Sequence, residues 1–235
     1  QVGSYHDFNM PCDLYYSCLD GNWNADGDDV FGEIIVSDSG YYNVDDVDML
    51  PEIAIGRIPA ETEAEFNNFF EKNYHYTDVG AVGNDVAYFV GENLNWDPVT
   101  WGGDYCDEII PLTNQDFHMS TLYDRDGTYS PNNVRSAINE GTAILNHMGH
   151  SNETMVFGQS SSMVNSYTNN EYGFAYSQGC YPAAFDESTS STGESIAENL
   201  VKSEHGLYAF VGNTRYGWYM PGSTNGASQY YNISF

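Results

Sequence analysis

Three reactive side chains each come directly after a segment that predicts a buried β-strand. They are Glu92 after residues 86–91, His150 after residues 142–148, and Cys180 after residues 172–178. In an open α/β sheet, ligands bind in the crevice beyond the carboxyl ends of the strands. We therefore expect the three side chains to converge at one edge of such a sheet.

These residue types predict nucleophilic catalysis on a carbonyl group. A thiol becomes a good nucleophile only as a thiolate, so Cys180 needs a base such as His150. An imidazole needs a partner on its second nitrogen, which Glu92 can provide. The alternative is structural: a small buried cysteine, a loop histidine bonded to a carbonyl, and one acid among many.

The elements that would position these residues alternate along the chain. Strands are predicted over residues 51–58, 86–91, 142–148, 172–178 and 206–212, and helices over 63–78, 104–110, 131–140 and 194–203. Thr62 and Glu65 form a capping-box pattern, and Ser130 before Pro131 is a typical helix start. This alternation predicts an α/β fold with an open, mostly parallel sheet flanked by helices on both faces.

We predict two subdomains. Residues 1–80 form an N-terminal subdomain with a turn-rich, acidic beginning, and residues 81–235 form the subdomain that carries the reactive residues. Gln1 is followed by neither a basic nor an apolar signal region, which fits an already processed or trimmed start. No apolar stretch approaches the length of a membrane span.

Charge is the strongest compositional feature of the chain. There are 34 acidic against 6 basic residues, for a net charge of −28. Such a field opposes binding to nucleic acid and to anionic membranes and attracts basic substrates. Adaptation to salt, metal binding or simple solubility would explain it equally well, and so would protection of a protease that cuts after Arg or Lys from its own activity.

The cysteine pattern leaves the redox state open. Cys12 and Cys18 are close enough in sequence to form a short disulfide in an oxidising compartment, whereas Cys106 and Cys180 stand alone. The chain has no C-x-x-C pair, which argues against the usual structural zinc site. Abundant Tyr, Asn and Ser are typical of an extracellular protein.

Several motifs resemble those of the gingipain family of cysteine peptidases, family C25, in the same order along the chain. They are AIGRIPAETEAEFNNFFEKNYHYT, FVGENLNW, YDRDGTYSPNNVRSAINEG, NHMGHSNETMVFG over residues 146–158, and YSQGCYPAAFD over residues 176–186. The resemblance extends from about residue 33 to about residue 230. It implies a caspase-like fold related to those of clostripain, legumain and the caspases.

The resemblance also implies roles for individual residues. Cys180 matches the nucleophile, His150 the general base and Glu92 the acidic partner of a secreted cysteine endopeptidase that forms a thioester acyl-enzyme. The oxyanion would be bound by the backbone N–H groups of Cys180 and Ser151. Ser151 departs from the family, in which glycine is usual, and this change reduces the room for a substrate.

Two further residues match the substrate-binding positions of arginine-cutting gingipains. Asp104 occupies the position of the acid that meets the P1 guanidinium, and Trp218 that of the aromatic residue that closes the pocket. A carboxylate with an aromatic face suits a guanidinium. The resemblance therefore implies cleavage after Arg, or after Lys. The alternative is a helix N-cap for Asp104 and a core position for Trp218.

Residues 22–33, NWNADGDDVFGE, approximate a calcium-binding loop. The candidate ligands are Asn22, Asn24, Asp26, Asp28 and Glu33, which supply the hard oxygen atoms that Ca²⁺ prefers. Asn at the first position departs from the usual pattern, and no flanking helices are predicted. A solvated acidic turn is the alternative. Family resemblance also implies calcium, and we expect no organic cofactor.

Two other functions compete with the peptidase. A non-catalytic calcium-binding surface module could retain a protease fold, and a metallohydrolase could use the pair His147 and His150. The spacing of that pair is weak evidence for a metal, and we expect His147 to pack near its strand end. Related catalytic domains continue beyond the point that matches Phe235. We therefore expect a zymogen whose sheet is completed by a further segment or by a second chain from proteolytic processing.

Overall fold

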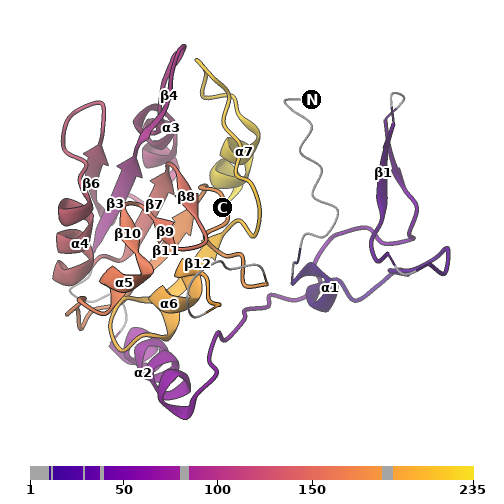
Figure 1. Cartoon of the computed structure of the whole chain (residues 1–235), viewed down its shortest axis with the longest axis horizontal. Coiled ribbons are helices and arrows are strands. Elements are labelled where there is room, and N and C mark those ends of the chain that lie inside the picture. The colour runs from indigo at the N-terminus through magenta and orange to yellow at the C-terminus, as the bar shows by residue number, and fades with distance from the viewer. Residues whose placement is uncertain (1–10, 12, 29, 38–39, 80–84, 187–192) are drawn as a thin grey trace. The chain divides into compact units, whose positions relative to one another are not determined.

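The computed structural model describes the chain except for residues 1–10, 12, 29, 38–39, 80–84 and 187–192 (Figure 1). It falls into two compact units, one over residues 11–57 and the other with residues 58–235 as its described part. The smaller unit contains α1 (Leu14–Ser17) and a hairpin of β1 (Ile34–Ser37) and β2 (Gly40–Asn43). Cys18 in this unit has a free thiol, whereas Cys12 lies outside the described residues.

A parallel five-stranded sheet organises the larger unit, in the order β12-β11-β7-β3-β6 (Figure 1). Its strands are β3 (Val86–Gly91), β6 (His118–Tyr123), β7 (Ile144–Met148), β11 (Gly173–Ser177) and β12 (Leu207–Gly212). This arrangement confirms the predicted α/β fold with a mostly parallel sheet. Because all five strands run in the same direction, their carboxyl ends share one edge.

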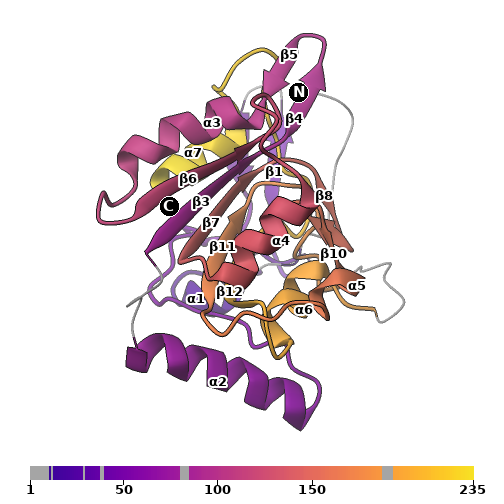
Figure 2. The ribbon, with the colours of Figure 1, turned by 90° about the vertical axis from the view of Figure 1, so that its left-hand side faces the viewer.

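Helices cover both faces of this sheet (Figure 2). One face carries α3 (Gly102–Ile109) with the 3-10 turn Ile110–Leu112 after it, and α7 (Ala227–Ser234); the other carries α4 (Pro131–Glu140), α5 (Ser161–Val164) and α6 (Ile196–Lys202). The apolar residues form one buried cluster on each face. Both faces of the central strands are therefore buried, as parallel sheets require.

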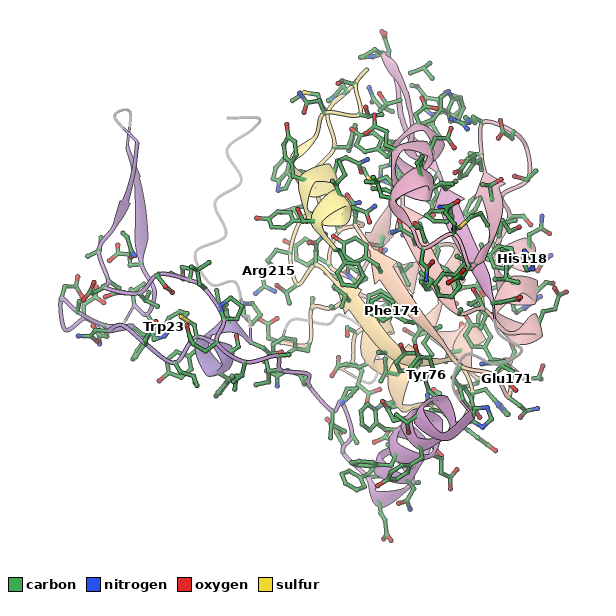
Figure 3. The ribbon with its side chains drawn as sticks, turned by 180° about the vertical axis from the view of Figure 1, so that it is seen from behind. Trp23, Tyr76, His118, Glu171, Phe174 and Arg215 are labelled. Atoms are coloured by element: carbon green, nitrogen blue, oxygen red, sulfur yellow. The ribbon has the colours of Figure 1, made fainter. Side chains whose placement is uncertain are left out.

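The long helix α2 (Glu63–Val79) packs against α6 and β12. Its Tyr76 ring stacks on Tyr208 of β12, with 4.1 Å between the ring centroids (Figure 3). The Nζ of Lys72 is buried and donates to the carbonyl oxygens of Val201 and Ser203 at the end of α6. The contacts of α2 are thus with the larger unit, which begins at Ile58 rather than at the predicted boundary after residue 80.

The predicted helix starts are confirmed by their hydrogen bonds. Thr62 Oγ1 accepts the N–H of Glu65 at 3.3 Å, and the Glu65 carboxylate accepts that of Thr62 at 3.0 Å. Ser130 Oγ accepts the N–H of Asn133 at 3.1 Å. Each bond satisfies an amide that the first helical turn would leave without a partner.

One predicted strand is wrong, and several short ones were missed. Residues 51–58 form no strand and are exposed throughout, so their alternating pattern does not reflect a buried face. The segment after Glu92, for which no element was predicted, contains a hairpin of β4 (Asn93–Trp96) and β5 (Val99–Trp101). A small antiparallel sheet of β8 (Ser151–Asn152), β9 (Met155–Val156) and β10 (Gln159–Ser160) follows His150. No described helix is long and apolar enough to cross a membrane.

Candidate active site

The three predicted catalytic residues follow three neighbouring strands of the sheet. Glu92 follows β3, His150 is separated by one residue from the end of β7, and Cys180 lies beyond the end of β11. Strand β7 pairs with both β3 and β11. The fold therefore brings the three residues to the same edge of the sheet.

Glu92 is largely buried and is held by three hydrogen bonds. Its Oε1 accepts the hydroxyl of Tyr129 at 2.8 Å and bonds Nε2 of His147 at 3.1 Å, while Oε2 accepts the backbone N–H of His150 at 3.1 Å. Burial opposes ionisation, but these bonds outweigh it and hold the pKa of Glu92 below its usual value. The carboxylate thus bonds the backbone of His150 and the ring of His147.

His147 extends this contact from Glu92 to the turn that carries Cys180. Its ring is fully buried, and Nδ1 lies 2.8 Å from Oγ of Ser177, which in turn accepts the N–H of Gly179 at 3.2 Å. With Nε2–H donating to the carboxylate, Nδ1 accepts from the Ser177 hydroxyl. We call this series of bonds, Glu92–His147–Ser177, the buried chain.

The buried chain explains one of the glycines at the strand ends. A Cβ on Gly149 would lie 2.2 Å from Nε2 of His147 and 2.7 Å from Cδ of Glu92. Contacts this short do not occur, so a side chain at this position would separate the two partners. Glycine is therefore required before His150 because the neighbouring side chains leave no room for a Cβ atom, in addition to its role in the turn.

The Cys180 thiol is half-buried and donates to the carbonyl oxygen of Gly217 at 3.6 Å. Burial raises the pKa of Cys180 above its usual value. Ser151 Oγ donates to the carbonyl of Cys180 at 2.7 Å and therefore links the histidine loop to the nucleophile. A Cβ on Gly179 would lie 2.1 Å from that same hydroxyl oxygen, which accounts for the glycine before the cysteine.

The turn after the nucleophile is held in a strained conformation. Tyr181 has a φ of 62°, in the left-handed region that non-glycine residues rarely adopt. Its N–H donates to the carbonyl of Arg215 at 2.7 Å, and the buried Arg215 guanidinium makes a two-point ion pair with Asp186. The loop after β12 thus fixes the backbone on the far side of Cys180.

The imidazole of His150 is the accessible member of the group. His150 is exposed, and within the described part of the chain no hydrogen bond joins its ring to the Cys180 thiol. Only its backbone is fixed, through Glu92. Rotation about its side-chain bonds would be needed for the ring to take the thiol proton.

The two residues predicted to bind the P1 side chain have separate surroundings. Arg125 forms ion pairs with both Asp104 and Asp107, and its guanidinium lies 4.7 Å from the ring centroid of Tyr123. Arg125 follows β6, and Cys180 follows β11. These two strands lie on opposite sides of β7 in the sheet. The Trp218 backbone N–H donates to Oγ of Ser228 on α7 at 2.7 Å, and its side chain is partly exposed.

In the smaller unit, three of the five predicted calcium ligands converge. One oxygen atom from each of Asp26, Asp28 and Glu33 lies within 4.8 Å of the others. The Oδ1 atom of Asn24 is buried without a hydrogen-bond partner among the described residues. Burial, and then repulsion from Asp28 and Asp26, raises the pKa of Glu33. A hard divalent cation fits the three carboxylates, because it would offset their mutual repulsion.

Asn22 and Asp45 bond the backbone of this loop. The side-chain oxygen of Asn22 accepts the backbone N–H of Asn24 at 3.1 Å. Sequence reasoning missed Asp45, a buried carboxylate that accepts the N–H groups of Ala25 and Glu33. The bond from Glu33 holds the pKa of Asp45 low. Asp45 thus fixes the backbone of the loop through the N–H groups of Ala25 and Glu33.

Comparison with known proteins assigns the family. The model of peptidase family C25 matches residues 1–235. The chain belongs to peptidase family C25. This membership supports a cysteine peptidase, as the sequence predicted. No match is found among curated proteins.

Two solved structures support the same fold. The first is gingipain R (RgpB), described as an Arg-specific cysteine proteinase, with 20% identity, a TM-score of 0.56, and a match covering 70% of this chain and 40% of that one. The second is the complex of the pro- and mature domains of RgpB from Porphyromonas gingivalis, with 21% identity, a TM-score of 0.58, and coverage of 71% and 42%. This C25 chain thus corresponds to less than half of each matched structure.

The sequence predicts only that His147 packs near its strand end, and the full burial of its ring agrees with that. The bonds of His147 to Glu92 and Ser177, and that of Tyr129 to Glu92, were missed. An H-x-x-H pair and an Asn-His dipeptide carry no signal for such a network. Only the pairing of β7 with both β3 and β11 creates it.

Replacement of His147 by Phe tests the buried chain. The variant keeps an aromatic ring beside Phe157 but removes one partner each from Glu92 and Ser177, so we expect it to lose about 1–3 kcal/mol of unfolding free energy at pH 7. Because the Glu92 pKa is depressed, its contribution is present above about pH 4.5 and is lost as the pH falls through the folded-state value. The difference from wild type should therefore shrink in acid.

Urea unfolding from about pH 8 down to the lowest pH at which the wild-type protein stays folded measures this effect, because the loss occurs below the ordinary Glu pKa of 4.5. His75→Phe is the matched control, because His75 bonds Glu171 at the surface and such pairs contribute about 0–1 kcal/mol. Equal losses in the two variants, or a His147→Phe loss independent of pH, would contradict the role of the buried chain.

Proposed function

We propose that this chain is the catalytic part of a cysteine endopeptidase with Cys180 as nucleophile and His150 as base. The observation that carries the proposal is the position of the two residues beyond adjacent parallel strands, joined by the Ser151 hydroxyl bond to the Cys180 carbonyl. Family membership supports the same reading.

In this mechanism the His150 imidazole rotates toward Cys180 and accepts the thiol proton. The thiolate attacks the scissile carbonyl, and the backbone N–H groups of Cys180 and Ser151 bind the oxyanion. The imidazolium then gives its proton to the leaving amine, which produces a thioester. Water, deprotonated by the same imidazole, attacks the thioester and releases the acid product and the thiol.

Glu92 takes part through the backbone. It binds the N–H of His150 rather than the ring, so it fixes the position from which the imidazole must reach the thiol. Burial of the Cys180 thiol favours its neutral form, and it is the imidazole that must draw the proton away.

For substrate preference, we propose cleavage after Arg, or after Lys. The charge of −28 attracts basic peptides, and Asp104 and Trp218 match the P1-binding positions of the family. In the free chain Arg125 already pairs with Asp104, so a P1 guanidinium would share or take this carboxylate. We further propose that the protein is secreted and made as a zymogen, since one matched RgpB structure contains pro- and mature domains.

We also propose that Ca²⁺ binds the loop of residues 22–33, with Asn24, Asp26, Asp28 and Glu33 as ligands and Asn22 at its margin. The ion would stabilise the smaller unit and take no part in the reaction.

Replacing Cys180 by Ala should reduce hydrolysis of an arginyl fluorogenic peptide by at least about a thousandfold without unfolding the protein. Cys106→Ala is the control, because the Cys106 thiol is fully buried, bonds the carbonyl of Val90, and has its pKa raised to about 12 by burial. That variant should retain activity. Iodoacetamide should label Cys180 and miss Cys106. Activity that persists in Cys180→Ala would refute the assignment, and a wild type that neither reacts nor cleaves would favour the non-catalytic calcium-binding module.

Asp104→Asn should lower the ratio of kcat/KM for a P1 Arg peptide to that for its uncharged P1 citrulline analogue by about tenfold, mainly through KM. Asp107→Asn is the matched control, since both carboxylates pair with Arg125 and only Asp104 occupies the proposed P1-binding position. Equal ratios in the two variants would remove Asp104 from the pocket.

Calcium should raise the thermal midpoint of unfolding of the wild-type protein. Glu33→Gln should weaken calcium binding by at least about tenfold in a calorimetric titration, because it removes one charged ligand. Glu52→Gln is the control, as Glu52 belongs to a separate acidic cluster with Cys18, Asp20 and Asp48. Loss of binding in the control alone would move the ion to that cluster.

A further inference from the structure

Gln178, two residues before the nucleophile, has a buried side-chain amide without a partner. The residue is 4% exposed, and neither Oε1 nor Nε2 makes a hydrogen bond within the described part of the chain. An amide offers two donor hydrogens and an acceptor oxygen, and leaving both ends buried and unpaired is costly. Native proteins rarely do so without a ligand or water to complete the bonds.

The direction of this side chain follows from the strand. The Gln178 N–H donates to the carbonyl of His147 at 3.0 Å and extends the pairing of β11 with β7. Side chains alternate along a strand. Ser177 faces His147. Tyr176 faces α7, where its ring centroid lies 4.7 Å from that of Phe235. Gln178 therefore points to the same side as Tyr176, the side of α7.

The loop after β12 borders this position and also contacts the nucleophile. A Cβ on Gly217 would lie 1.8 Å from the carbonyl oxygen of Gln178, so the two backbones are in direct contact. The Gly217 carbonyl accepts the Cys180 thiol, and the next residue, Trp218, is tied to Ser228 of α7. The unpaired amide, the thiol and the Trp218 loop thus belong to one region of the molecule.

A peptide attacked by Cys180 has its P1 side chain attached to the carbon next to the reacting carbonyl. The Asp104 carboxylate is already paired with Arg125, whereas the Gln178 side-chain amide has no partner within the described part of the chain. The amide can accept from an N–H of the P1 side chain and can donate to an oxygen acceptor. The Gly217–Trp218 loop would move outward to admit that side chain.

We infer that Gln178 is a specificity-determining residue that hydrogen-bonds the P1 side chain and selects unbranched side chains carrying N–H groups over unbranched apolar ones. This inference rests on the proposed endopeptidase function and adds to it a neutral recognition group beside the nucleophile. A site built around such a group discriminates strongly, because an apolar P1 residue leaves the amide unpaired. The selection does not depend on charge, so it is separable from that of Asp104.

The test is kcat/KM for peptides that differ only at P1, carrying Arg, citrulline or norleucine. Citrulline keeps the N–H groups of Arg without its charge, and norleucine has neither. In Gln178→Leu, the citrulline-to-norleucine ratio should fall by at least about tenfold, because no amide remains to be satisfied. In Gln178→Glu, the Arg-to-citrulline ratio should rise by at least about tenfold, because the new carboxylate favours a cation.

Thermal unfolding separates selection from folding. Gln178→Leu removes two unpaired polar atoms, so its midpoint should equal or exceed that of the wild type. Gln178→Met, which keeps the length of the side chain, replaces it if the leucine variant does not fold. Gln159→Leu is the control: this buried glutamine bonds the carbonyl of Pro131, and its loss should lower the midpoint while leaving the P1 ratios unchanged.

Unchanged P1 ratios in active Gln178 variants would overturn the inference alone and would mean that the amide binds only a buried water. A wild type that cleaves none of the peptides would overturn the proposed function and this inference together.

Discussion

The hydrogen-bonded pair of Glu92 and His147 is the interaction on which the candidate site depends. A carboxylate this buried is tolerated only when its oxygen atoms are hydrogen-bonded. Its partners come from β7, from the loop before α4, and from the backbone of His150 itself. Through Ser177 the same contact reaches Gly179, so one network fixes the ends of β3, β7 and β11 relative to one another. The segments that carry His150 and Cys180 take their positions from this network.

How far the sequence could predict this molecule follows from the range of each interaction. The helix starts at Thr62 and Ser130 depend on bonds to residues three positions away, and they were predicted. The alternation of strands and helices likewise identified four of the five sheet strands, β6 being missed, and the edge that Glu92, His150 and Cys180 share. The prediction of a strand over residues 51–58 is wrong because a strand needs a hydrogen-bonded partner as well as an alternating pattern. This exposed segment has no partner strand among the described elements. The buried chain escaped prediction because it requires knowing which strands are neighbours.

The basic residues show how the charge of the chain is used. Each of the six has a hydrogen-bond or ion-pair partner: Arg57, Lys72, Arg125, Arg135, Lys202 and Arg215. Lys202 and Arg215 are buried against carboxylates, where breaking a pair would leave an uncompensated charge. With its own cations engaged in this way, the protein presents its excess negative charge to the solvent. A field of this kind attracts basic peptides at long range, but it selects no particular peptide bond.

Ser151 illustrates why a departure from a family pattern has to be judged in three dimensions. From the sequence, a side chain in place of glycine beside the histidine only reduces space. In the structure its hydroxyl bonds the Cys180 carbonyl, and the glycine at position 179 leaves room for that hydroxyl. The bond joins the loop after β7 to the turn after β11, and the buried chain joins the ends of the same two strands. Two independent links therefore hold the segment of His150 and Ser151 to that of Cys180. A side chain that the sequence alone reads as an obstruction thus also fixes the geometry of the candidate site.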